Sequence, residues 1–166
     1  GDGSGGIRTN GISFTGVHDA CSTDNIEEGM IVDSTGELWL SVGMNTSLPY
    51  IAKSTTEKSK TVYGVIESNE IRSGRAFAVK DKKPYTVNAL GEGKVWVTNT
   101  SGEPTNGDYV TSSVIPGYGQ LQDDDILHSY TVAKLTESID WSSVTETIDH
   151  EGVTSVSYTH LRAHET

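Results

Sequence analysis

The chain has 166 residues, a formal net charge of −11 and a pI of about 4.7. Its 12 Lys and Arg residues are scattered, whereas nucleic acids and anionic membranes are bound by clustered cations, so we exclude a nucleic-acid partner and disfavour a membrane surface. No apolar run approaches the roughly 18 residues of a membrane span, so we expect no membrane insertion. Cys21 is the single cysteine, which excludes an internal disulfide and a zinc site of four cysteines.

The hydrophobic share is low for a globular domain. It is 34%, below a usual share of about 45–50% that includes glycine. We therefore expect a thin core in one domain or in two small, packed halves. The chain begins at Gly1 and shows no basic segment followed by an apolar one, so we expect an interior fragment without a signal peptide.

Strand patterns recur along the chain after a glycine-rich lead-in over residues 1–16, whose first six residues, GDGSGG, we expect to be a linker or a frayed end. Short β-branched, aromatic or alternating segments predict strands at 11–17, 30–32, 37–40, 61–66, 75–80, 85–90, 94–98, 108–112, 114–115 and 129–135. The turn residues between 30–32 and 37–40 predict a β-hairpin there, and the polar stretch 45–59 predicts a loop.

No segment keeps apolar residues at helical spacing over several turns, so few or no helices are expected. Eight or more short strands between glycine-rich turns predict an all-β fold, either a barrel or a sandwich. The β-rich module is expected to span residues 17–148.

The two halves of this module show a weak internal sequence similarity, which we call the sequence echo. Residues 29–34 resemble 107–112, and residues 61–68 resemble 131–138, in the same order. Two related β half-units would explain the echo, and chance similarity between β segments is the alternative.

The C-terminal part shows no strand pattern, and we expect an irregular tail over 149–166. Its last ten residues, SYTHLRAHET at 157–166, resemble translated adapter read-through at the ends of metagenomic reading frames. We therefore expect this segment to be non-native, and we predict no metal site from the pair His160 and His164.

The candidate reaction centre is a short segment that contains His18, Asp19, Cys21 and Ser22. A Cys or Ser nucleophile beside a His, with an Asp to orient it, is the arrangement of nucleophilic catalysis. On an extended strand, however, His18 and Cys21 face opposite sides, so a turn at Asp19-Ala20 would be needed to bring them together. The alternatives are a turn with a buried free cysteine, or metal binding by His18, Asp19 and Cys21.

Two further groups carry weaker hypotheses. The carboxylates of Asp123-Asp124-Asp125 lack the alternating spacing of a calcium loop, so an acidic loop is favoured over a calcium site. The tryptophans Trp39, Trp96 and Trp141 could form a sugar-binding platform, but packing in a β core is favoured. No cofactor and no metal are therefore predicted.

Residues 91–138 resemble a known module. The run GEGKVWVT at 91–98 is followed by NGDYVTSS at 106–113, by PGYG at 116–119 and by YTVAKL at 130–135. This order is similar to a module of phage and bacterial tail-associated proteins. That module often precedes or overlaps the self-cleaving chaperone region of viral appendages, the peptidase G2-like group. The resemblance covers roughly residues 26–140, although the "YAE" segment of the self-cleaving group is replaced by the stretch that begins at His18.

The resemblance implies a structural or interaction module of a viral tail fibre or appendage, located in the virion. It implies a homotrimer that contacts other virion proteins. Two alternatives remain open: a self-cleaving intramolecular chaperone, whose only enzymatic activity would be one autoproteolytic turnover, and a carbohydrate-binding fibre tip that contacts a host-surface glycan.

Overall fold

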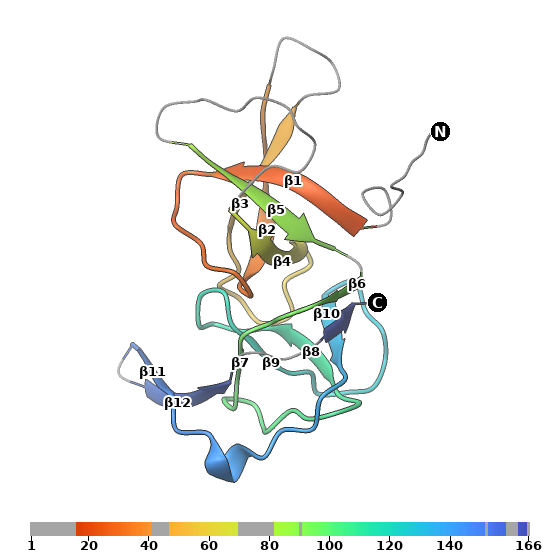
Figure 1. Ribbon diagram of the computed structural model, residues 1–166, viewed down its shortest axis with the longest axis vertical. Coiled ribbons are helices and arrows are strands. Elements are labelled where there is room, and N and C mark those ends of the chain that lie inside the picture. The colour runs from red at the N-terminus through yellow and green to blue at the C-terminus, as the bar shows by residue number, and fades with distance from the viewer. Residues whose placement is uncertain are drawn as a thin grey trace.

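The computed structural model describes residues 16–40, 47–69, 82–89, 91–151, 153–158 and 163–165. Within these ranges the strands form a closed barrel and a second sheet, which lie one above the other in Figure 1. The prediction of an all-β fold is confirmed, and η1 (Trp141–Ser143), one turn of 3₁₀ helix, lies beside the second sheet.

The barrel is built from the first strands of the chain. They are β1 (Val17–Ser22), β2 (Ile31–Trp39), β3 (Leu48–Lys53), β4 (Val62–Ser68) and β5 (Lys83–Asn88). The order β1-β3-β2-β4-β5 closes through the antiparallel pair of β5 with β1. The pair β1–β3 is parallel, and the other pairs are antiparallel.

The second sheet has the order β11-β12-β7-β9-β8-β10-β13-β6 among the described residues. Its strands are β6 (Gly91–Gly93), β7 (Val97–Thr98), β8 (Tyr109–Ser112), β9 (Gly119–Leu121), β10 (Thr131–Leu135), β11 (Thr147–His150), β12 (Val153–Tyr158) and β13 (Ala163–Glu165).

Strands β2 and β4 are buried on both faces at residues 31–32 and 65–66, and this joins the barrel to the second sheet. Successive strand residues point to opposite sides. Val32 and Ile66 therefore belong to the core inside the barrel, whereas Ile31 and Val65 belong to the core shared with the second sheet. This two-sided burial explains why both residues are apolar in each of the pairs 31–32 and 65–66.

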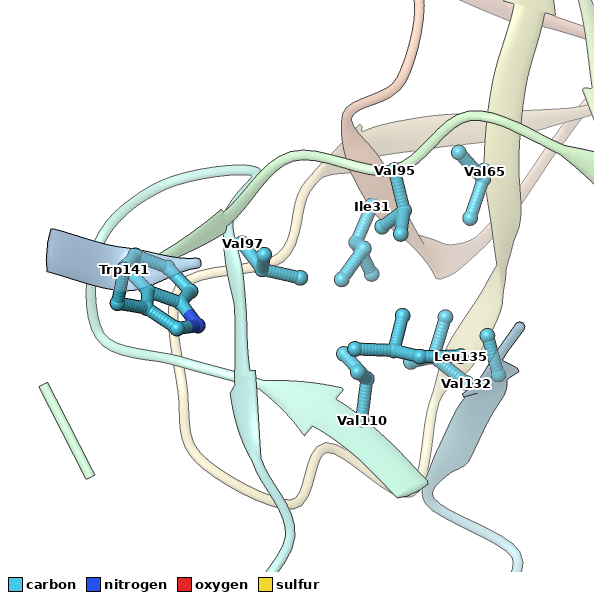
Figure 2. Packing of buried hydrophobic residues seen from close by; sticks show 9 residues of the cluster. Ile31, Val65, Val95, Val97, Val110, Val132, Leu135 and Trp141 are labelled. Atoms are coloured by element: carbon cyan, nitrogen blue, oxygen red, sulfur yellow. The ribbon is translucent and has the colours of Figure 1, made fainter. Parts of the chain in front are cut away.

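The shared core draws its side chains from both bodies. In Figure 2, Ile31, Val65 and Val95 face Val110, Val132 and Leu135, with Trp141 at one end beyond Val97. Most of these side chains are less than 5% exposed. Burying an aliphatic side chain of this size contributes about 1.5–3 kcal/mol, so this layer is a major source of the attraction between barrel and sheet.

Three backbone hydrogen bonds close a ring where barrel and sheet meet. Ile31 N donates to Gly117 O (2.8 Å), Gly117 N to Ser54 O (2.9 Å), and Ser54 N to Ile31 O (3.0 Å). These residues lie at the start of β2, just after β3 and in the turn before β9. We call this group the three-residue ring. It satisfies both backbone polar groups of each buried residue and fixes the position of the turn against the barrel.

A second series of backbone hydrogen bonds runs beside the ring. Gly119 N donates to Trp96 O (2.8 Å), Trp96 N to Gly29 O (2.9 Å), and Gly29 N to Ile66 O (2.9 Å). The ladder of the second sheet thus continues through an irregular segment into β4 of the barrel. Barrel and sheet are consequently one hydrogen-bonded structure.

The predicted hairpin over 30–32 and 37–40 is wrong, because β2 is one continuous strand from Ile31 to Trp39. The turn residues between the two runs instead produce an irregularity in the pairing with β3, between Ser34 and Leu38. Gly36 has a φ of +88°, which glycine accepts without strain. Turn chemistry within a strand therefore marks a bulge here.

Two predictions near the ring are also wrong. The loop predicted over 45–59 contains β3, which lies between β1 and β2, so pairing on both sides outweighs its polar composition. The strand predicted at 114–115 is a turn, in which Ser113 Oγ accepts from Ile115 N (3.1 Å) and donates to Tyr118 O (2.7 Å). The strand β9 that follows was not predicted, because only one of its three residues is apolar.

The predicted irregular tail over 149–166 is wrong where the structure describes it. Strands β11 and β12 form an antiparallel hairpin in which His150 pairs with Val153, and β13 lies between β10 and β6. Two residues separate His150 from Val153, and Glu151 has a φ of +51°, as tight hairpin turns require. The non-native origin of 157–166 stays a prediction. Most of the predicted lead-in (1–15) and the strand predicted at 75–80 lie outside the described residues.

The sequence echo has a structural counterpart. Its first two segments contribute β2 and β4, which pair antiparallel in the barrel, and its second two contribute β8 and β10, which pair antiparallel in the second sheet. The registers differ by one residue, because Val32 pairs with Gly64 whereas the equivalent Val110 pairs with Ala133. Two related half-units predict that both pairs of segments form antiparallel neighbours, as they do, although with a shift of one residue. A common origin of the two half-units stays a prediction.

Replacement of Gly117 by Ala tests the ring. Gly117 has a φ of +81°, and an added Cβ would lie 3.0 Å from Met30 side-chain atoms. We expect a loss of about 1–2 kcal/mol from the left-handed backbone and a further loss of about 1–3 kcal/mol from overpacking. Urea unfolding measures the change. The matched control is Gly107→Ala, at a φ of +93° with open space around it, which should show only the backbone loss. Equal losses of unfolding free energy in Gly117→Ala and Gly107→Ala would contradict the expected clash of the new Cβ with Met30.

Candidate functional site

The structure places the predicted reaction centre in β1. His18 is exposed, Asp19 is half-buried, and Cys21 and Ser22 are buried. The turn that would bring His18 to Cys21 is not formed, because residues 17–22 pair continuously with β5. Because His18 and Cys21 are an odd number of residues apart on this extended strand, their side chains point to opposite sides. The ring of His18 lies 5.9 Å from that of Tyr63.

The chemistry of Cys21 is that of a buried thiol. Its Sγ lies 3.8 Å from Pro49 O, as a weak donor. Burial raises the pKa of Cys21 to about 11, and nearby Lys82 lowers it only in part. A nucleophilic cysteine needs the thiolate form, so this environment opposes activation. Ser22 Oγ accepts a hydrogen bond from Asp24 N (3.1 Å) in the turn that ends the strand.

The acidic run at 123–125 forms a loop held together by its own side chains. Asp124 accepts hydrogen bonds from Gln122 Nε2 (2.9 Å) and Ile126 N (3.1 Å), and it pairs with His128 Nε2 (3.0 Å). These contacts, the one with His128 above all, lower the pKa of Asp124. Asp123 pairs with Lys58 Nζ (2.8 Å). Within the described ranges, no three His, Cys, Asp or Glu side chains are grouped so that they could hold a metal ion.

The three tryptophans lie in different environments. Trp141 is buried in the shared core and donates from Nε1 to Pro104 O (2.8 Å), as the packing interpretation predicts. Trp39, at the end of β2, is half-buried. Trp96 is also half-buried and lines a cleft. Buried Trp141 cannot join an exposed platform with the other two, and Trp96 lines a cleft among the described residues.

This cleft lies beside the junction of the barrel and the second sheet and measures about 490 Å³. Its lining residues are Ile26, Glu27, Glu28, Ile66, Asn69, Lys94 and Trp96. We call it the Trp96 cleft. A second cavity of about 170 Å³ shares Glu28, Ile66 and Lys94 with it, so the two form one continuous depression.

The backbone around the cleft is fixed by the junction between barrel and sheet. Trp96 Nε1 donates to Glu28 O (3.2 Å), and the Trp96 ring lies 5.5 Å from that of Tyr118 at an angle of 58°. Gly29 admits the ring, because a Cβ there would lie 3.0 Å from Trp96 Cδ1. The aromatic wall is therefore held in one orientation.

Carboxylates dominate the charge near the cleft. Burial raises the pKa of Tyr118, and the nearby carboxylates of Glu27 and Glu146 raise it further. Glu28 and Lys94 are exposed on the rim of the cleft. The arrangement offers acceptors and one cationic donor beside the ring of Trp96.

Sequence reasoning named Trp96 but missed the other residues of the cleft. Glu27 and Glu28 stand immediately before β2, and Lys94 stands two residues before Trp96. Nothing in their local pattern distinguishes them from solvated surface charges. They converge because Trp96 N donates to Gly29 O, a contact 67 residues apart in the chain. Long-range pairing of this kind is not readable from one sequence.

Comparison with protein-family models, with curated proteins and with solved structures finds no match to this chain. Among the described residues, no helix has the length and apolar character required to cross a bilayer. The candidate site therefore has to be interpreted from its own geometry.

The environment of Cys21 predicts low reactivity. Because the pKa of the thiol is raised to about 11, the thiolate is scarce at pH 8 in the folded chain and becomes common only on unfolding. We expect alkylation by iodoacetamide at pH 8 to be at least about 100-fold slower in the native protein than in guanidinium. Mass spectrometry of the alkylated chain over time measures both rates. Native labelling at the unfolded rate would contradict this account and restore Cys21 as a candidate nucleophile.

Proposed function

We propose that this chain is a structural and interaction module of a viral, phage-like tail fibre or appendage, and that it acts as a homotrimer in the virion. The observation that carries the proposal is the position of two segments of the resemblance, NGDYVTSS at 106–113 and PGYG at 116–119. Apart from Asn106, they lie within residues 107–120, which form the turn and strands that join barrel to second sheet. We call residues 107–120 the motif. The resemblance thus concerns the element on which the module's architecture depends.

The side chains of that motif are committed to structural contacts. Asp108 Oδ2 accepts from Thr105 N (2.9 Å), and Ser112 Oγ accepts from Ser59 N (2.9 Å) and donates to Thr56 O (2.6 Å). Tyr118 N donates to Ile115 O (3.0 Å) across a type II turn with Gly117 at positive φ. These contacts support a scaffolding role for the motif.

Exposed apolar side chains support contact with further copies. Leu38 and Leu40 lie two residues apart, on the same side of an extended chain, and are 56% and 71% exposed. Adjacent apolar side chains left in solvent are characteristic of surfaces that are covered in an assembly. We therefore assign the end of β2 to the contact between subunits. A second exposed pair, Ile126 and Leu127, lies in the acidic loop.

Native mass spectrometry of the full 166-residue chain, with a denatured spectrum of the same sample, tests this proposal. We expect trimers of intact chains. The double variant Leu38→Ser/Leu40→Ser should shift the population to monomers, because it removes the apolar contact area. The control Val114→Ser changes a single exposed apolar side chain, which needs no partner surface, and should remain trimeric. Intact monomers in the unsubstituted protein would contradict the trimer.

The same experiment separates the self-cleaving alternative. One discrete shorter chain in the denatured spectrum, abolished by Cys21→Ala or His18→Ala, would replace the structural proposal by self-processing. The burial of Cys21 in the extended strand β1, on the opposite side from His18, favours intact chains.

A further inference from the structure

We propose that the Trp96 cleft binds a neutral saccharide. The inference goes beyond the structural role proposed above. A saccharide ring combines an apolar face of C–H groups with a periphery of hydroxyls. Its site therefore needs an apolar surface beside an aromatic ring, surrounded by hydrogen-bonding groups.

The apolar surface of the cleft comes mainly from Trp96, whose ring is half-buried. Ile26 and Ile66 also line the cleft, but they are only 5% and 3% exposed and therefore add little surface of their own. The volume of about 490 Å³ falls within the range of roughly 300–1,000 Å³ that small-molecule sites occupy.

The rim supplies the groups that hydroxyls require. The exposed side chains of Glu27 and Glu28 accept hydrogen bonds, Lys94 donates them, and the amide of Asn69 can do both. Hydrogen bonds with an ionised partner are about twice as strong as neutral ones. A set of carboxylate, ammonium and amide groups around an aromatic ring thus matches vicinal hydroxyls on a sugar.

The charge of the rim selects a neutral sugar over an acidic one. The two carboxylates of Glu27 and Glu28 outnumber the ammonium of Lys94, and the whole chain carries −11. Sialic acids, uronic acids and sulfated sugars would meet repulsion from the same sign of charge.

The geometry of the two rings argues against an alkylammonium ligand. An aromatic cage encloses a cation between ring faces. Here the centroids of Trp96 and Tyr118 are 5.5 Å apart and the rings are tilted against each other, so they fill that space themselves. Trp96 is the one aromatic side chain among the described residues that line the cleft, and a single ring suits stacking on a sugar.

The stacking surface is organised before any ligand binds. The indole of Trp96 is fixed by its hydrogen bond to Glu28 O, by its contact with Gly29 and by the Tyr118 ring. A side chain that is already ordered loses little conformational entropy on binding, which favours affinity for a weakly held ligand such as a sugar.

A printed array of neutral and sialylated oligosaccharides, incubated with the full chain, tests the proposal. We expect binding to neutral glycans and none that requires sialic acid. Glu27→Gln and Glu28→Gln should each weaken the affinity for the best array ligand by roughly tenfold or more, measured by calorimetry, because each removes an ionised acceptor. The control Glu103→Gln changes an exposed carboxylate outside the cleft and should leave affinity unchanged.

Trp96→Ala should abolish binding, and thermal unfolding of this variant shows whether the fold survives the loss of packing. If Trp96→Ala does not fold, Glu27→Gln and Glu28→Gln still test the proposal, because Glu27 and Glu28 are exposed and their replacement leaves the packing intact. Competition by free methyl glycosides would identify a terminal sugar as the ligand, and competition by intact oligosaccharide alone would identify an extended glycan. Absence of neutral-glycan binding, or wild-type affinity in both Gln variants, would overturn the proposal.

Discussion

The three-residue ring is the constraint on which the rest of the structure depends. Ile31, Ser54 and Gly117 each give one backbone N–H and accept at one backbone carbonyl within the ring. A buried backbone group without a partner costs about 1–3 kcal/mol, so none of the three segments can move away alone without leaving unpaired groups behind. The ring thereby sets the positions of β2, the segment after β3 and the turn before β9.

The shared core and the Trp96 cleft both follow from this junction. With β2 fixed, Ile31 faces Val110 across the shared core, and the adjacent Gly29 accepts the Trp96 backbone. The indole of Trp96 then forms the wall of a cleft whose other side belongs to the barrel. The segment 107–120 thus acts as a scaffold for the surface beside the junction. In the fibre module proposed above, the fold would stay constant and recognition would reside in such surface sites.

The sequence predicted those features that depend on local pattern. The strands around Val65, Val87 and Val132 follow from β-branched runs. Features that depend on distant pairing were not predictable. β3 is a strand because two neighbours pair with it, and β2 runs through a turn-like segment by absorbing it as a bulge. Of the candidate site only Trp96 was foreseen, because the carboxylates of Glu27 and Glu28 reach the cleft through contacts far apart in sequence.

Native-state hydrogen exchange at the three ring amides tests most directly the claim that barrel and second sheet are one cooperative structure. The account predicts that the amides of Ile31, Ser54 and Gly117 exchange with one common free energy, equal to that of global unfolding measured with urea. An opening free energy at Gly117 several kcal/mol below that of Ile31 would contradict it. In that case the turn would detach while the barrel stays folded, and the junction would not hold the two bodies together.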